Sequence, residues 1–133
     1  MAGSLKDLST YRFDRALEEL ENAKAMFEIG KYKMALNRSY YSVFHSMRAV
    51  NVLDEFDSSK HSGVIAHFNQ YHVKEGDFPK EASKIIKSLS EMREHADYED
   101  FFVASRQDAE EQILKAEHFL QLTKSYLTVK GIL

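Results

Sequence analysis

The stretch YKMALNRSYYSVFHSMRAVNVL, residues 32–53, decides the fold. Its apolar side chains recur at intervals of four and three residues, which is the period of an amphipathic α-helix. This stripe consists of Leu36, Tyr40, Val43, Met47 and Val50. A helix with one apolar face buries that face against other elements of the same core. The stretch therefore predicts the long central helix of a helical protein.

The segments on both sides of this stretch have the same period. Thr10 is expected to cap a helix that begins near Tyr11, because a hydroxyl side chain can accept a hydrogen bond from the first turn. Gly30 is expected to end that helix, since glycine readily adopts the left-handed conformation of a helix C-terminus. A shorter helix is predicted over residues 60–71.

Two more helices are predicted in the second half of the chain. Pro79 suits the first turn of one of them, and its apolar stripe extends to Ala96. Ser105 and Asp108 resemble a capping box with Asp in place of Glu, and they open a last helix that ends at about Val129.

Five helical segments with short connections predict an all-α fold, an antiparallel up-and-down bundle of four long helices plus one short helix. We expect a single domain over residues 1–133 with an ordered core at about 10–129. The composition agrees, because 5 Gly and 1 Pro are too few for an all-β fold with many hairpins. The absence of cysteine excludes disulfides, thiolate catalysis and zinc–thiolate or iron–sulfur sites.

The charge and hydropathy of the chain limit its partners. The net charge is −3, so any contact with RNA requires a local basic surface rather than bulk attraction. Residues 1–10 lack the apolar stretch of a signal peptide, and no run of about 18 apolar residues is present. We therefore expect a cytoplasmic protein that does not enter a membrane.

The central helix carries polar side chains opposite its apolar stripe. At about 100° per residue, one face collects Arg38, Tyr41, His45 and Arg48. On a later helix, Arg93 and Asp97 are one turn apart, and Asp97 can pair with Arg93 or reach across to Arg38. We expect one cleft or interhelical groove to gather Arg38, Tyr41, His45, Arg93 and Asp97. The alternative is a structural polar network that fixes the register of the helices.

Metal and serine chemistry find little support in the sequence. His95 and Glu99 are four residues apart, but a metal site in a bundle needs matching carboxylates on facing helices. His61, His67 and His72 are not spaced at one α-helical period. No nucleophile elbow surrounds a serine. We therefore expect neither a metal site nor a cofactor.

The aromatic residues bear on assembly. The chain has 9 Phe and 7 Tyr, more than one small core readily absorbs, which favours a homodimer. Phe101 and Phe102 are expected to plug one end of the bundle. Alternatively, the two rings form part of a surface that contacts a partner.

Two motifs resemble the HEPN domain family. Residues 35–45, ALNRSYYSVFH, are similar to its Ala-x-x-Arg-x-Tyr-Tyr-x-x-Phe-His pattern. Residues 93–98, REHADY, are similar to its Arg-x-x-Ala-Asp-Tyr segment. The segment KHSGV at 60–64 and the following Phe68 fit between them. The similarity covers about residues 10–128, and the subgroup that it resembles is the compact stand-alone UPF0332 kind.

The resemblance implies a helical bundle that is commonly dimeric. It also implies a gene-neighbour relationship with a minimal nucleotidyltransferase, often as a toxin–antitoxin pair. Many HEPN proteins are metal-independent endoribonucleases with an Arg-x4–6-His segment duplicated across the dimer. In that chemistry a histidine serves as general acid or base, and an arginine stabilises charge on the phosphate.

This sequence departs from that ribonuclease pattern. Arg93 matches the arginine, but after four intervening residues Tyr98 stands in place of histidine. His95 is only two residues away, about 200° around the helix from Arg93. The candidates for catalysis are therefore Arg93 with His45 or His95.

Three functions remain open. The first is a HEPN-like module that binds a nucleotide, RNA or a partner nucleotidyltransferase, with the binding residues Arg38, Tyr41, His45, Arg93, Asp97 and Tyr98. The second is a metal-independent endoribonuclease toxin, and the third is a purely structural dimerising bundle. The resemblance further implies a tyrosine that accepts a nucleotidyl group from the partner, and Tyr98 is the tyrosine nearest to Arg93 in the motif.

Overall fold

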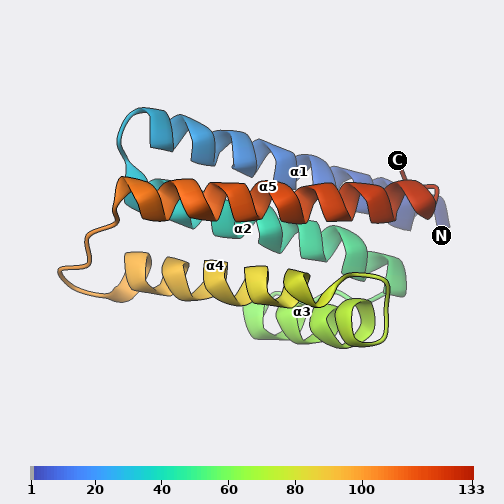
Figure 1. Ribbon diagram of the computed structural model, residues 1–133. Helices are drawn as coiled ribbons and strands as arrows, with labels where there is room; N and C mark the ends of the chain where they lie inside the picture. Colours follow the sequence, from blue (N-terminus) through green and yellow to red (C-terminus); the bar gives the residue numbers. More distant parts are fainter. Residues whose placement is uncertain (1) are drawn as a thin grey trace.

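The computed structural model describes residues 2–133, and five α-helices make up most of that part of the chain (Figure 1). The helices are α1 (Ala2–Glu28), α2 (Tyr32–Asn51), α3 (His61–Phe68), α4 (Lys80–Tyr98) and α5 (Arg106–Val129). A 3-10 turn over Val52–Asp54 extends α2, and a π-helix over Asn69–Lys74 extends α3. The predicted fold class, four long helices plus one short helix, is confirmed.

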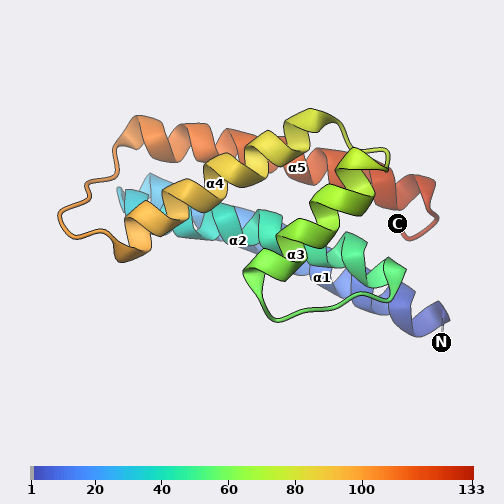
Figure 2. The same cartoon turned by 90° about the horizontal axis from the view of Figure 1, so that it is seen from below.

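The four long helices run in alternating directions, so both ends of the chain lie at the same end of the bundle (Figure 1). Helix α3 crosses the bundle at a steep angle, as the second view shows (Figure 2). Helix α2 contacts α1, α3, α4 and α5, which makes it the centre of the fold. The predicted stripe on α2 is confirmed as core, because Leu36, Tyr40, Val43, Met47 and Val50 are all buried.

Two of the predicted helix ends are confirmed. Gly30 follows α1 with a φ of 77°, in the left-handed region that glycine adopts without steric cost. At α5, the Asp108 N–H donates to Ser105 Oγ at 2.9 Å, and the Ser105 N–H donates to Asp108 Oδ2 at 3.2 Å. These reciprocal bonds form the capping box that the sequence predicts.

The predicted start of the first helix is wrong. Helix α1 begins at Ala2 rather than near Tyr11, and Thr10 lies inside it. The Thr10 hydroxyl donates to the carbonyl of Lys6 at 3.0 Å, so the side chain is satisfied within the helix instead of capping it. The added turns pack on α2, where the buried Ser9 hydroxyl donates to the Ala49 carbonyl at 2.6 Å.

The expected aromatic plug is also wrong for Phe101, whose side chain is fully exposed. The connection between α4 and α5 projects beyond the bundle (Figure 1), so a residue at its tip cannot reach the core. Phe101 has a φ of 62°, which is uncommon for a bulky residue. Phe102 is half-buried, and its ring stacks on His95 at 5.9 Å between centroids.

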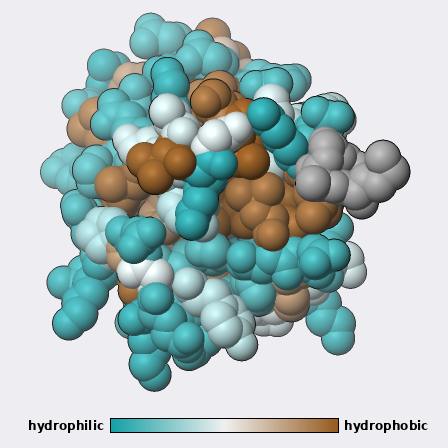
Figure 3. Space-filling model, turned by 90° about the vertical axis from the view of Figure 1, so that its right-hand side faces the viewer, coloured by the Kyte–Doolittle hydropathy of each residue, from teal (hydrophilic) through white to brown (hydrophobic). Residues whose placement is uncertain are grey.

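The end of the bundle that carries both termini has an apolar centre. Figure 3 shows apolar residues in the middle of this face, surrounded by hydrophilic ones. A hollow of about 260 Å³ between the start of α4 and the end of α5 is lined by residues that include Phe78, Tyr126 and Val129. Within residues 2–133, none of the helices is both long and apolar enough to span a membrane.

Candidate functional site

Arg93 is a buried cation between α4 and α2. Only 8% of the residue is exposed, although arginine is rarely buried without a full set of partners. Its guanidinium carbon lies 4.7 Å from the centroid of the Tyr40 ring and 5.7 Å from that of Tyr98. These distances are within the range of cation–π attraction, which favours the charged group at this position.

The polar contacts of Arg93 are long and few. Its Nη1 lies 3.4 Å from the Tyr98 hydroxyl and 3.7 Å from Asp97 Oδ2. Its Nε is buried and has no hydrogen-bond partner among the residues that the structure describes. A guanidinium has five N–H donors, so Arg93 keeps unused capacity to bind an acceptor.

Tyr40 links Arg93 to His61 on α3. The Tyr40 hydroxyl and His61 Nδ1 are 2.8 Å apart. Burial raises the pKa of Tyr40 to about 12, against the opposing effect of Arg93, so its hydroxyl stays protonated. Burial and the charge of Arg93 lower the pKa of His61. His61 is therefore a neutral imidazole at pH 7.

A second set of contacts connects Arg93 to α1. Asp97 accepts two hydrogen bonds from Asn37 Nδ2, at 3.2 and 3.0 Å. Asn37 Oδ1 in turn accepts from Arg38 Nε at 3.0 Å. Arg38 Nη1 then donates to Glu19 Oε2 at 2.6 Å, and Glu19 is buried. Charges of alternating sign thus join α1, α2 and α4 through one asparagine.

Tyr41 and His45 continue this face along α2. The Arg38 guanidinium carbon lies 5.1 Å from the Tyr41 ring centroid, and the Tyr41 and His45 centroids are 6.3 Å apart. Burial, followed by the charge of Arg15, lowers the pKa of His45 to about 4. Arg48, the last residue of the predicted stripe, instead donates to Asp57 at 2.9 Å.

The structure brings together four of the five residues that were expected to converge. These four are Arg38, Tyr41, Arg93 and Asp97, with Asn37 as the link between α2 and α4. His45 lies one turn further along α2, and in the described part of the chain no hydrogen bond or ring contact joins it to Arg93. Tyr98 joins the group through its contact with Arg93.

His95 faces away from this group. Its Nδ1 pairs with the Glu99 carboxylate, its ring stacks on Phe102, and its side chain is about half exposed. The expected separation from Arg93 around the helix is therefore what the structure has. Neither histidine candidate for catalysis is in contact with Arg93.

Three contributors to the site, Asn37, Tyr40 and His61, are not predicted from the sequence. Tyr40 belongs to the apolar stripe, yet its hydroxyl reaches past the core to His61. His61 was not assigned to the site because its spacing from the other histidines does not fit one helix face. In the structure it reaches Tyr40 of α2 from a different helix, α3. A sequence signal that could have indicated the contact between Tyr40 and His61 is the tyrosine pair at positions 40 and 41 followed by a histidine in the 60–64 segment.

A family model described as "HEPN domain" matches residues 9–126. The chain belongs to the HEPN family. A UPF0332 protein of Thermotoga maritima is 36% identical over 106 residues, which are 80% of each chain. A relative named "Putative toxin" from Methanocaldococcus jannaschii is 36% identical over 112 residues, 84% of this chain and 83% of the relative. A second protein of that organism with the same kind of name is 31% identical over 120 residues, 90% of this chain and 82% of the relative.

A solved structure supports the fold of this HEPN domain. The crystal structure of the protein TT1696 from Thermus thermophilus superposes with a TM-score of 0.74. The match covers 88% of this chain and 96% of the other. The sequence identity is 17%, so the likeness concerns the fold alone.

Removal of the Asp97 carboxylate should destabilise the protein. In Asp97→Ala, Asn37 loses its acceptor and the buried Arg93 loses its nearest anion. Because the Asp97 side chain is 27% exposed, we expect a loss of about 1–2 kcal/mol in the free energy of unfolding. Urea denaturation measures it, with Asp100→Ala as an exposed control that should stay within ~0.5 kcal/mol. Equal effects of the two substitutions would contradict the network.

The depressed pKa of His45 should make stability depend on pH. Between pH 6.5 and about 4 the unfolded chain protonates His45 while the folded protein does not, so stability is lost as the pH falls through this window. After allowance for partial exposure, we expect a contribution of about 1–2 kcal/mol. Urea denaturation at pH 7 and pH 4.5 should show a smaller loss for His45→Gln than for the unsubstituted protein. The control is His118→Gln, a substitution at an exposed histidine. The prediction would be contradicted if His45→Gln lost as much stability between pH 7 and pH 4.5 as this control does.

Proposed function

We propose that this HEPN domain is a toxin-type module that binds a phosphate group of RNA or of a nucleotide at Arg93, between α2 and α4. The guanidinium of Arg93 carries this proposal, because it is held between tyrosine rings and its ion pair with Asp97 is long, at 3.7 Å. A planar guanidinium matches the oxygens of a phosphate, and the pairing is charge-assisted. The names of the two Methanocaldococcus relatives support a toxin-type role.

The surroundings of Arg93 suit a nucleotide or single-stranded RNA. Tyr98 is 73% exposed beside the guanidinium, and its ring offers a face on which a base can stack. The carboxylate of Asp97 is 3.7 Å from Arg93, so an incoming phosphate oxygen would approach the nitrogens that Asp97 does not engage. Arg38 adds a second cation, which Asn37 and Asp97 link to Arg93.

The geometry favours binding over cleavage. A general acid or base must come within about 3 Å, between heavy atoms, of the group whose proton it transfers, directly or through one water. His45 and His95 make no contact with Arg93, and the Nδ1 of His61 is engaged by the Tyr40 hydroxyl. We therefore propose binding without a cofactor, and cleavage of RNA is the second candidate function.

We further propose that a minimal nucleotidyltransferase regulates the module through Tyr98. The phenol oxygen would attack the α-phosphorus of a nucleoside triphosphate, so that a phosphodiester bond forms, pyrophosphate leaves and the phenol proton passes to solvent. The product would hold a phosphate beside Arg93 and thereby occupy the binding site. Exposure of the Tyr98 ring gives a partner access to the hydroxyl.

A homodimer is part of the same proposal. Two apolar residues are exposed at the end of the bundle where α2 begins. Val103, in the connection before α5, is 83% exposed, and Met34, near the start of α2, is 48% exposed. Gly30, Phe102 and Val103 line a hollow of about 430 Å³ there, together with residues at the start of α2. Association at this end of the bundle would cover these apolar side chains.

Binding of RNA should depend on Arg93. We expect Arg93→Gln to weaken binding of a short fluorescent single-stranded RNA about 10–100-fold, because the phosphate loses a charge-assisted hydrogen bond. Fluorescence anisotropy in the presence of EDTA measures the dissociation constant. Lys130→Gln removes the same charge at the C-terminal end of α5 and should change binding less than about threefold.

The same reaction mixtures separate binding from cleavage. Intact RNA after incubation with the unsubstituted protein agrees with a binding module. Cleavage that is lost in Arg93→Gln would favour the ribonuclease instead. If Arg93→Gln does not fold, Arg93→Lys retains the charge but not the planar fork, and binding should still weaken. Unchanged binding in a folded Arg93 variant would contradict the proposal.

Tyr98 should be the residue that receives the nucleotidyl group. After co-expression with a neighbouring minimal nucleotidyltransferase, intact-protein mass spectrometry should show the mass of one or more nucleotidyl groups. Tyr98→Phe should abolish the increase, since it removes only the acceptor oxygen. Tyr71→Phe is the matched control, because Tyr71 is also exposed, at 53%. An increase that survives Tyr98→Phe would contradict this assignment.

A further inference from the structure

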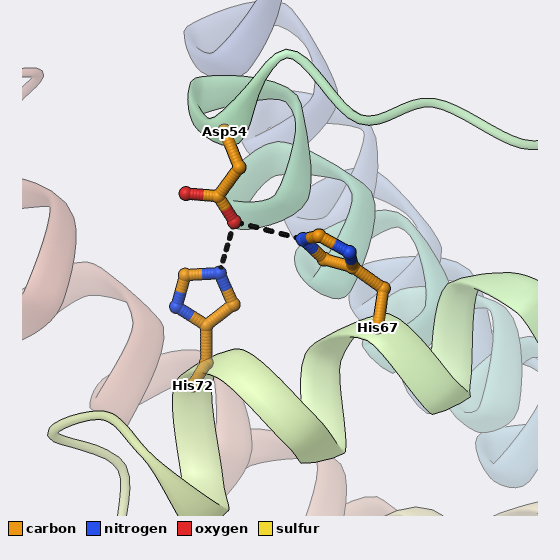
Figure 4. Close-up of side chains that lie close together, drawn as sticks. All are labelled: Asp54, His67 and His72. Carbon is orange, nitrogen blue, oxygen red and sulfur yellow. Dashed lines mark hydrogen bonds and ion pairs between the residues drawn. The ribbon is translucent and has the colours of Figure 1, made fainter.

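Asp54, His67 and His72 meet where the π-helix passes the end of α2 (Figure 4). Both histidines direct Nε2 at the same carboxylate oxygen, Asp54 Oδ2, at 2.9 Å for His67 and 2.6 Å for His72. The three ligand atoms lie within 4.8 Å of one another. This cluster is separate from Arg93, which lies between α2 and α4 and contacts none of the three.

The π-helix explains how two histidines five residues apart come to share a face. In an α-helix, a spacing of five rotates the second side chain by about 140° relative to the first. The π-helical hydrogen bonds link residues five apart, so Asn69–Lys74 returns His72 to the side of His67. The sequence argument against a metal site at these histidines assumed an α-helical period, and that period does not apply here. Six π-helical residues in succession are rare, and π-helical turns are frequent at functional sites.

Aromatic packing, rather than the carboxylate alone, orients the two imidazoles. The His67 ring is stacked on Phe56, with 4.0 Å between centroids and 9° between planes. His72 is 5% exposed, and Phe68 and Tyr126 pack against its ring at 5.5 and 5.7 Å. The nitrogen atoms are thus held in position before any ligand arrives, which reduces the entropy cost of binding.

The chain around His72 is equally constrained. The Phe78 N–H donates to the His72 carbonyl at 2.9 Å, where the chain turns back after the π-helix. Gly76 lies so close to this turn that a Cβ there would be 2.6 Å from the Tyr71 carbonyl oxygen and 2.7 Å from His72 Cα. Glycine is therefore required for the tight turn that fixes the position of His72.

We propose that Asp54, His67 and His72 bind a divalent transition-metal ion such as Zn²⁺. Two imidazole nitrogens and one carboxylate oxygen are a ligand set that zinc accepts, with a fourth position for water. Tetrahedral bonds of about 2.1 Å place ligand atoms roughly 3.4 Å apart, so the 2.9 and 2.6 Å contacts need to open by about 0.5 and about 0.8 Å. Asp54 is exposed at a helix end and can make that adjustment.

The ion would join the end of α2 to the helical segment that follows it. Between Asp54 and His61 the chain is a loop. Its Asp57 pairs with Arg12 and Arg48, and its Phe56 stacks on His67. A metal bridge closes this loop and stabilises the folded state by mass action, because the unfolded chain lacks the assembled site. The bound ion would therefore raise the melting temperature.

Titration of untagged, chelator-treated protein with Zn²⁺ tests the proposal by isothermal titration calorimetry. We expect one ion per chain in the unsubstituted protein. His67→Gln and His72→Gln should each weaken binding by about 100-fold or more, since loss of a ligand exceeds the 10–100-fold effect of an outer-shell change. His118→Gln, at an exposed histidine paired with Glu81, should bind as the unsubstituted protein does.

Two further measurements keep the test independent of whether the variants fold. Co²⁺ in the unsubstituted protein should give the intense visible absorption of a tetrahedral site. Zn²⁺ should shift the ring NMR signals of His67 and His72 while those of His118 stay in place. Absence of one-to-one binding, or equal affinity in His67→Gln, His118→Gln and the unsubstituted protein, would overturn the proposal. In that case the three side chains form a hydrogen-bonded cluster without a metal.

Discussion

The pairing of Arg38 with the buried carboxylate of Glu19 constrains how α2 lies against α1. A buried carboxylate is costly without a partner, and Glu19 obtains one from Arg38 and a second from Asn22 on its own helix, whose Nδ2 donates at 2.9 Å. The pair fixes the rotation of α2, because a turn about its axis would separate Arg38 from Glu19. It therefore also determines which residues of α2 face α4.

That rotation places Asn37 and Tyr40 toward α4. Asn37 donates to Asp97, while the Tyr40 ring lies under the Arg93 guanidinium. Both Asp97 oxygens accept from Asn37 Nδ2, and Arg93 forms a long ion pair of 3.7 Å with one of them, Oδ2. The surrounding tyrosine rings stabilise its charge without using its N–H donors. The incomplete satisfaction of Arg93 is thus a consequence of how the network that starts at Glu19 is built.

The sequence predicted the elements more completely than their contacts. The stripe on α2 could be predicted because five apolar residues repeat at one period. The Ser105–Asp108 capping box could be predicted because its two partners are close in the sequence. The start of α1 was missed because a threonine hydroxyl is satisfied as well inside a helix as at its end. Asn37 and Tyr40 were missed because their roles depend on the rotation of α2 against two other helices, which no local pattern encodes.

The two histidine-containing sites illustrate different reasons for such failures. His61 reaches Tyr40 from another helix, so its role depends on how α3 crosses α2. His67 and His72 share a face only because residues 69–74 form a π-helix, and the α-helical period gives the wrong rotation there. In both cases the residue types were visible in the sequence, but the backbone geometry that combines them was not.

The most direct test of the account is whether a phosphate group contacts the guanidinium of Arg93. Two-dimensional ¹H–¹⁵N NMR of the arginine Nε–H groups, during titration with a short single-stranded RNA, reports on each guanidinium separately. We predict that the Arg93 signal shifts progressively to saturation, while the signal of Arg12, which already has a bidentate pair with Asp57, remains in place. An Arg93 signal that stays unchanged while other signals report RNA binding would contradict the account.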